Sequence, residues 1–176
     1  MTKEYKPAII QVQRGKEGKT MKDARKVICF DMDGTIADLY SVEGWLTYLK
    51  QEDATPYIKA NPMWDMVQLK NVLLKLAAQG WEIRVISWLS KDSTNAYKDE
   101  VRKAKLAWLK QYDFPFTVAH LVQYGTTKAD CVRRIANPAI LVDDNRQVRK
   151  GWTLGQTIDP THGNLIKNLE KLLERN

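Results

Sequence analysis

Residues 27–37, Val-Ile-Cys-Phe-Asp-Met-Asp-Gly-Thr-Ile-Ala, contain the pattern that decides the fold of this chain. The apolar run 27–30 contains no side chain that requires water, so it predicts a short buried strand. Asp31 and Asp33 follow where that strand ends, and in open α/β sheets ligands bind at the carboxyl ends of strands. Two neighbouring carboxylates repel each other, and Mg²⁺ prefers one or two carboxylates together with water and phosphate oxygens. The sequence therefore predicts a Mg²⁺ site where this strand ends.

Closely spaced aspartates also occur in calcium-binding loops. An acidic pair after a strand can equally be a plain surface turn. A calcium-binding loop of the EF-hand type needs Gly at loop position six and Glu at position twelve. Counted from Asp31, Gly34 stands at position four and Val42 at position twelve, which excludes such a loop. An acidic turn without function is disfavoured only if partner residues appear further along the chain.

Three later positions supply such partners. Residues 81–87 predict a second strand, which ends in the hydroxyl of Ser87. Lys128 stands in Gly-Thr-Thr-Lys-Ala-Asp, residues 125–130, where a helix is expected to begin. Residues 139–142 form another apolar run, and Asp143 and Asp144 follow it directly. Together these features indicate a site for Mg²⁺ and a phosphate group. The acidic pairs at two strand ends suit the metal, and the hydroxyl and the lysine suit the phosphate.

This order of features resembles the four signatures of the haloacid dehalogenase (HAD) superfamily of phosphohydrolases. The resemblance implies that Asp31 is the nucleophile and that Asp33 is the acid and base, with its backbone carbonyl on the metal. It also implies that Lys128 neutralises the charge of nucleophile and phosphate. The remaining implied roles are phosphate or substrate binding by Thr35 and Ser87, and completion of the Mg²⁺ site by Asp143 and Asp144, with Asp144 favoured as the direct ligand. Thr35 is also expected to support the loop and to help set Asp33. Trp88, directly after Ser87, either lines the entrance for the substrate or packs in the core.

Within the superfamily, Asp33 indicates the type of reaction. The ATPases that resemble this motif have Thr at that position, and the dehalogenases lack the acid, so Asp33 favours a phosphatase or, less readily, a phosphomutase. Response-regulator receivers also place acids, a hydroxyl and a lysine around Mg²⁺, but their acidic pair comes first and their lysine last. Here Lys128 precedes Asp143 and Asp144, which disfavours a signalling receiver.

The remaining pattern predicts an α/β fold, with a Rossmann-like parallel sheet that has helices on both faces. A length of 176 residues suits one domain. We expect a basic extension at 1–25 and a phosphatase domain at 26–176, with a small helical cap inserted at 38–65. The remaining expected elements are helices at 42–49, 66–78, 92–111 and 164–173 and strands at 117–122, 139–142 and within 151–158.

Charge is concentrated at the start of the chain. Residues 1–26 hold eight Lys and Arg against three Asp and Glu, a net charge of +5, whereas the remaining 150 residues have a net charge of +2. This extension is either a solvated tail or an arm that attracts nucleic acid, and its alternating residues 8–13 favour a strand. The absence of a long apolar stretch predicts no membrane partner, and the two isolated cysteines favour a cytoplasmic setting.

The substrate class is open between several candidates. Residues 105–110 and 140–146 look similar to the 5′(3′)-deoxyribonucleotidase branch of the superfamily, which carries a small helical cap. Trp45, Tyr48 and Trp64 would then either stack on a base or pack the cap onto the core. The first candidate is a phosphatase for a nucleoside monophosphate or another small phosphorylated metabolite. The alternatives are a phosphatase for 3′- or 5′-phosphorylated ends of DNA or RNA, and a non-catalytic phospho-ligand-binding protein with a relict site. The sequence predicts no particular oligomeric state.

Overall fold

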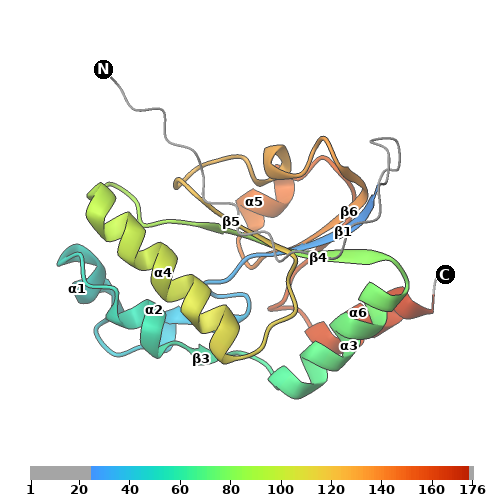
Figure 1. Ribbon diagram of the computed structural model, residues 1–176, viewed down its shortest axis with the longest axis horizontal. Coiled ribbons are helices and arrows are strands. Elements are labelled where there is room, and N and C mark those ends of the chain that lie inside the picture. Colours follow the sequence, from blue (N-terminus) through green and yellow to red (C-terminus); the bar gives the residue numbers. More distant parts are fainter. Residues whose placement is uncertain (1–24, 175–176) are drawn as a thin grey trace, which may run out of the picture.

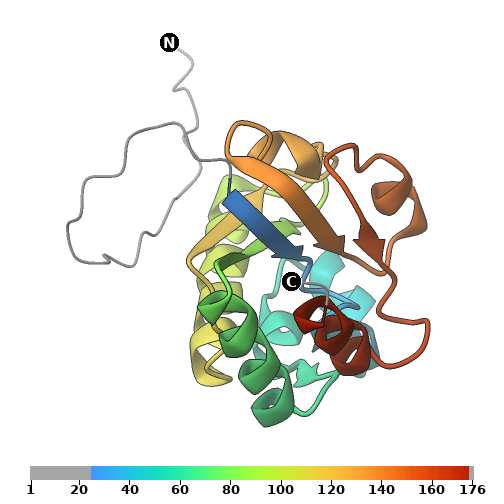
Figure 2. The ribbon, with the colours of Figure 1, turned by 90° about the vertical axis from the view of Figure 1, so that its right-hand side faces the viewer.

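A computed structural model describes residues 25–174, so the predicted strand at 8–13 and almost all of the basic extension lie outside the described residues. Five strands form one parallel sheet in the order β5-β4-β1-β6-β7. Figure 2 shows β1, β6 and β7 pointing the same way, so their carboxyl ends lie along one edge. The strands are β1 (Arg25–Phe30), β4 (Trp81–Trp88), β5 (Val118–Val122), β6 (Ala136–Val142) and β7 (Thr157–Ile158).

Helices cover both faces of this sheet. The helices α3 (Met66–Ala78), α4 (Asn95–Gln111) and α6 (Leu165–Leu173) lie on one side, and α5 (Arg146–Lys150) lies on the opposite side (Figure 1). The predicted Rossmann-like fold with two covered faces is therefore confirmed.

The residues of β1 explain why both faces need cover. Because successive side chains of a strand point to opposite faces, Ile28 and Phe30 join one hydrophobic cluster and Val27 and Cys29 join another. The first cluster includes apolar residues of α3, α4 and α6, and the second includes Trp152, beyond α5. All four β1 residues have no exposed surface, as the continuous apolar run predicted.

Local capping chemistry sets the helix boundaries. Helix α3 begins after Asp65, whose carboxylate accepts hydrogen bonds from the backbone N–H groups of Val67 and Gln68. Helix α4 begins after Thr94, whose hydroxyl accepts from the N–H of Tyr97, so it starts three residues later than the expected 92. Of the strand predicted within 151–158, only Thr157–Ile158 pairs with β6.

The segment of residues 38–65, called here the cap segment, connects β1 to α3. It contains η1 (Leu39–Ser41), α1 (Trp45–Lys50) and α2 (Thr55–Lys59), and a short antiparallel pair, β2 (Ala37–Asp38) with β3 (Asn61–Pro62), joins its ends. The expected helix 42–49 is wrong at its start, because Gly44 adopts a left-handed conformation with φ of 71° and α1 begins after it. Helix α2 was not predicted.

Two further differences concern the later part of the chain. Lys128 begins a short 3₁₀ helix, η2 (Lys128–Cys131), rather than an α-helix. Helix α5 was not predicted because its five residues are too few to show an apolar period.

No described helix combines the length and the apolar character needed to cross a membrane.

Candidate functional site

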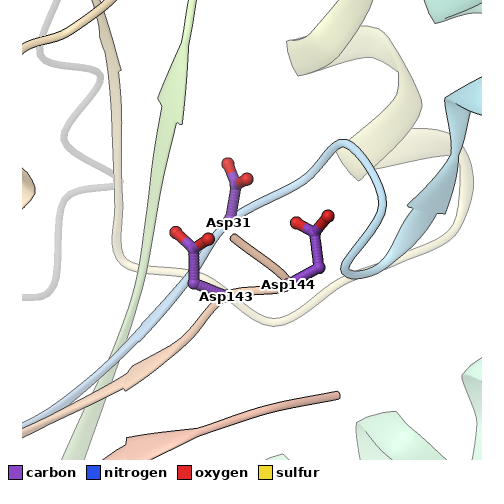
Figure 3. A group of neighbouring side chains, drawn as sticks. All are labelled: Asp31, Asp143 and Asp144. Carbon is purple, nitrogen blue, oxygen red and sulfur yellow. The ribbon is translucent and has the colours of Figure 1, made fainter. Parts of the chain in front are cut away.

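Three aspartates converge where β1 and β6 end. One carboxylate oxygen from each of Asp31, Asp143 and Asp144 lies within 4.8 Å of the other two. Figure 3 shows the three side chains on adjacent segments, with Asp31 after β1 and the other two after β6. The parallel register that pairs Phe30 with Val142 brings these segments together, and the N–H of Asp31 donates to the carbonyl of Val142 at 2.9 Å. The sheet thus joins residues more than a hundred positions apart.

The ammonium of Lys128 lies between two of these carboxylates. Its Nζ atom is 2.9 Å from Oδ1 of Asp31 and 2.7 Å from Oδ2 of Asp143. Burial alone would lower the pKa of Lys128, but the attraction of these two carboxylates outweighs it and holds the pKa above its ordinary value. Lys128 therefore places a positive charge between Asp31 and Asp143.

Asp143 and Asp144 have different surroundings. Asp143 is fully buried, and its two oxygens accept hydrogen bonds from Lys128 and from the N–H of Asn145. Burial and the nearby Asp31 carboxylate raise the pKa of Asp143 to about 6, although Lys128 opposes the shift. Asp144 is partly exposed and uses Oδ1 to accept from the hydroxyl of Thr35 at 3.2 Å. Asp144 is thus the better placed of the two to reach a bound cation.

Gly34 and Thr35 fit the first loop closely against Asp144. Gly34 has φ of +75°, and a Cβ atom there would lie 2.7 Å from Oδ2 of Asp144 and 2.8 Å from the ring of Tyr40. Thr35 is fully buried, and its hydroxyl also accepts from the N–H of Asp144 at 3.1 Å. This hydroxyl therefore supports Asp144, and the expected roles of Thr35 in setting Asp33 and in binding phosphate stay predictions.

Asp33 has a partner that the sequence analysis missed. Nζ of Lys105, on α4, lies 2.6 Å from Oδ2 of Asp33 and also donates to Ser87 Oγ at 2.8 Å and to the carbonyl of Trp88 at 2.9 Å. The Lys105 side chain is 1% exposed. Burial raises the pKa of Asp33 despite this ion pair, and the neighbouring Asp31 carboxylate adds to the rise.

A signal for Lys105 is present in the sequence. Val101, Lys105 and Trp108 follow the spacing of one helix face, and all three are buried in α4. A lysine on an otherwise apolar stripe is almost never buried unless it is paired. The position of Lys105 on this stripe therefore predicts a buried acidic partner, although it does not say which one.

The two residues at the end of β4 lie at different depths. Ser87 is fully buried behind Lys105 and is not among the residues that line the cavity at this edge of the sheet. Because Lys105 donates to its oxygen, the Ser87 hydroxyl can still donate its own hydrogen. Trp88 does line the cavity, and its indole N–H donates to the carbonyl of Thr126 at 2.9 Å, which fixes the ring.

A cavity of about 260 Å³ lies over the carboxylates. The cap segment supplies one wall with Leu39, Tyr40, Trp45, Leu49 and Tyr57. The opposite wall comes from the segments after β4, β5 and β6. Its members are Trp88, Leu89, Ser90, Lys91, Tyr124, Asn145 and Val148. The floor carries Asp31, Asp33, Lys128, Asp143 and Asp144, so one polar end is enclosed by largely apolar and aromatic walls.

The predicted cap aromatics divide into two groups. Trp45 lines the cavity and packs edge-on against Tyr40 at 5.1 Å between ring centres. Trp64 does not line it, because its indole N–H donates to the carbonyl of Thr35 at 2.8 Å and the ring packs against the core. Tyr48 is also absent from the lining. Packing therefore accounts for Trp64, and only Trp45 of the three reaches the cavity.

Carboxylates of this kind suit a hard divalent cation. Asp31 and Asp144 offer oxygens toward the cavity, while burial and the repulsion of Asp31 raise the pKa of Asp144, so a cation there would relieve an unfavourable cluster. The carboxylate of Asp33 is not part of the acidic group and pairs with Lys105 instead.

Comparison with solved structures identifies the fold. A chain of a Pnkp1/Rnl/Hen1 complex aligns with a TM-score of 0.53 and 18% identity, over 78% of this chain and 46% of that chain. A structure described as a HAD-like phosphatase, from Mesorhizobium loti, aligns with a TM-score of 0.51 and 13% identity, over 97% of this chain and 95% of the other. The chain has the HAD-like fold.

A third structure with this fold is D,D-heptose 1,7-bisphosphate phosphatase from Burkholderia thailandensis. It aligns with a TM-score of 0.51 and 11% identity, over 85% of this chain and 99% of that one. No model of a protein family and no curated protein matches the sequence. Because the sequence identities are this low, the comparisons show the HAD-like fold alone. This chain spans less than half of the length of the Pnkp1-complex chain.

Proposed function

We propose that this chain is a Mg²⁺-dependent phosphomonoester hydrolase of the HAD superfamily that works through an aspartyl-phosphate intermediate. The observation that carries the proposal is the convergence of Asp31, Asp143 and Asp144 within 4.8 Å, with Lys128 in contact with two of them. The HAD-like fold and the cavity above this group support the same activity.

In the first step, an oxygen of the Asp31 carboxylate attacks phosphorus, and the bond from phosphorus to the ester oxygen breaks. The leaving oxygen takes a proton from Asp33. A carboxyl whose pKa is raised by burial keeps its proton more readily, and Lys105 holds this carboxyl in position. Lys128 balances negative charge on Asp31 and on the phosphate oxygens throughout.

In the second step, water attacks the phosphorus of the aspartyl-phosphate, and the bond from phosphorus to the Asp31 oxygen breaks. Asp33, now a carboxylate, accepts the proton from that water, and inorganic phosphate leaves. The ion pair with Lys105 stabilises Asp33 in this charged form, so the pair helps the residue act as acid and then as base.

Asp31 and Asp144 would hold the metal, with Asp143 supporting Lys128 and the backbone carbonyl of Asp33 as a further ligand. Bound Mg²⁺ supplies charge stabilisation for the phosphate as negative charge develops. Asp143 is the less favoured direct ligand because it is fully buried and each of its oxygens already accepts one hydrogen bond.

The cavity walls favour a nucleoside monophosphate among small substrates. Its lining includes the rings of Tyr40, Trp45, Tyr57, Trp88 and Tyr124, and its basic residues are only Lys91 and Lys128. Aromatic walls suit the planar base of a nucleoside. Cytoplasmic location and nucleic-acid binding by the basic extension stay predictions.

The test is turnover of p-nitrophenyl phosphate and of a panel of nucleoside monophosphates, with Mg²⁺ and with EDTA. Asp31→Asn should reduce kcat by at least about 10³-fold because the nucleophile is lost, while the circular dichroism spectrum stays unchanged. Measurable turnover by a folded Asp31→Asn variant would contradict covalent catalysis. Complete inactivity of the wild-type protein on every phosphomonoester would favour the alternative, a phospho-ligand-binding protein with a relict site.

A further inference from the structure

A second cavity adjoins the first on the side away from the cap segment. It measures about 410 Å³ and shares five lining residues with the catalytic cavity. Those shared residues are Trp88, Tyr124, Lys128, Asn145 and Val148. A substrate held over Asp31 can therefore extend past the Trp88 and Tyr124 rings into a further space, which the hydrolysis of a mononucleotide does not need.

The wall between the two cavities is an aromatic pair. The rings of Trp88 and Tyr124 are tilted by 52° with their centres 4.8 Å apart, and Tyr124 is 52% exposed. The hydrogen bond from Trp88 to the carbonyl of Thr126 holds the larger ring in place. Trp88 is partly buried, with the Lys128 ammonium 5.4 Å from its ring centre, so Tyr124 offers the more exposed ring of the pair. Aromatic rings of this kind are the surfaces on which bases of single-stranded nucleic acid stack.

Beyond the shared residues, the lining of the second cavity is uncharged and mixes polar with apolar residues. The hydroxyl residues Thr126 and Thr127 line it together with the amide side chains of Asn145 and Gln147, and no Asp or Glu is among its lining residues. The catalytic cavity, in contrast, has four aspartates in its lining. Hydroxyls and amides both donate and accept hydrogen bonds, as the edge of a base and a sugar hydroxyl require.

Basic side chains accompany this cavity. Lys128 is part of its lining, and the ammonium of Lys91 lies 5.6 Å from the centre of the Tyr124 ring. Arg146 and Lys150 are exposed on α5, the helix that also supplies part of the lining. Their charges favour a ligand that carries phosphodiesters beside its bases.

We propose that the second cavity is a subsite for the adjoining nucleotide of a single-stranded nucleic acid whose terminal phosphate lies over Asp31. The proposal rests on the proposed phosphatase activity and deepens it, because the substrate becomes the phosphorylated end of a strand. The base of this adjoining nucleotide stacks on the rings of Trp88 and Tyr124. The second cavity holds the sugar of the same nucleotide and the phosphodiester that follows it.

The experiment compares thymidine 3′- and 5′-monophosphate with the matching 3′- and 5′-phosphorylated tetrathymidylates. The wild-type protein should hydrolyse one tetranucleotide with a kcat/KM at least about fivefold above that of its mononucleotide, since stacking and phosphodiester contacts add to binding. The two ends are measured separately, and the preferred one identifies the polarity of the strand.

The deciding variant is Gln147→Glu, which puts a negative charge into the second cavity with almost no change of shape. Acidic residues suit the first turn of a helix, so α5 should be retained. Gln156→Glu is the matched control, because Gln156 is exposed and lines neither cavity. Gln147→Glu should remove the advantage of the tetranucleotide and leave turnover of p-nitrophenyl phosphate within about twofold, whereas Gln156→Glu should keep the advantage.

Binding gives a second readout that does not depend on turnover. Fluorescence anisotropy measures the affinity of the phosphorylated tetranucleotide for Asp31→Asn, with and without Gln147→Glu. A tetranucleotide no better than a mononucleotide, or equal losses in Gln147→Glu and Gln156→Glu, overturns the subsite. If no substrate is hydrolysed, the proposed activity fails, yet Gln147-dependent binding still supports the subsite and its absence rejects it.

Discussion

At the scale of single residues, two buried lysines organise this site. Lys128 contacts Asp31 and Asp143, and Lys105 contacts Asp33, so each lysine stabilises the charged form of different carboxylates. In the proposed mechanism Asp31 is the nucleophile and Asp33 exchanges the proton, and each of the two carboxylates has its own lysine partner. Only Lys128 was predicted, and Lys105 is the addition that the geometry contributes.

The first residue-scale prediction concerns Lys105→Met, which keeps the stem of the side chain and removes its charge. Burial already raises the pKa of Asp33, and loss of the ion pair should raise it further. The carboxylate needed to accept a proton from water then forms only at higher pH. We expect kcat at pH 7 to fall by at least about tenfold and the acid limb of the pH profile to move up by about one unit.

The control is Lys105→Arg, which keeps the positive charge beside Asp33. It should retain an acid limb close to that of the wild type, even if the larger head group lowers kcat. A Lys105→Met variant with lower kcat but an unmoved acid limb would assign Lys105 a purely structural role.

At the scale of elements, the cap segment is fixed to α4 at several points. The indole N–H of Trp108 donates to the carbonyl of Ala60 at 2.7 Å, and the hydroxyl of Tyr97 donates to the carbonyl of Asp53 at 3.1 Å. Just before α4, the N–H and hydroxyl of Thr94 donate to the carboxylate of Glu52 at 2.7 and 2.5 Å. Because α4 also carries Lys105, the helix links the cap segment to Asp33 at the floor of the cavity.

Trp108→Phe tests this attachment. Trp108 is 2% exposed, so the change leaves the carbonyl of Ala60 without its donor in a buried place. We expect the free energy of unfolding, measured in urea, to fall by about 1–3 kcal/mol. Tyr97→Phe, which removes a less buried hydrogen bond from the same helix, should cost less. Equal stability of Trp108→Phe and wild type would contradict this account.

At the scale of the whole molecule, the sheet gathers negative charge from distant parts of the chain. Burial raises the pKa values of Asp33, Asp143 and Asp144 in the folded state, and that of Asp143 lies at about 6. A carboxyl with a raised pKa binds its proton more tightly in the folded than in the unfolded state. Its stabilising contribution is therefore complete below the ordinary pKa and is lost as pH rises through the folded value.

A metal-dependent prediction follows for thermal unfolding. In EDTA, the contribution of this cluster to stability should decline between about pH 4 and pH 6. Mg²⁺ binds the ionised carboxylates, so it should raise Tm at pH 7.5 and much less at pH 5; a tenfold excess over its Kd adds about 1.4 kcal/mol.

Asp144→Asn is the control for the metal effect. In EDTA at pH 7.5 the variant should unfold at a higher temperature than the wild type, because one repelling charge is gone. It should also lose most of the increase in Tm that Mg²⁺ causes. An equal Mg²⁺ effect at both pH values, or in this variant, would contradict a cation site at these carboxylates.

The α/β class, four of the five sheet strands to within a few residues, and the positions of the acidic strand ends could all be predicted from residue types alone. This was possible because an apolar run records burial on both faces, and parallel strands bring their carboxyl ends to one edge. Capping residues and short helices were less readable: α2 and α5 have only five residues each, too few to show a period.

Which side chains meet depends on the packing of the folded chain. Lys105 and Asp33 are 72 positions apart, and the packing of α4 against the sheet joins them. The folded arrangement also buries Ser87, occupies both oxygens of Asp143, directs Trp64 into the core and leaves Trp88 and Tyr124 between two cavities. Such contacts depend on where a helix crosses a sheet, and no local pattern of residue types records that position.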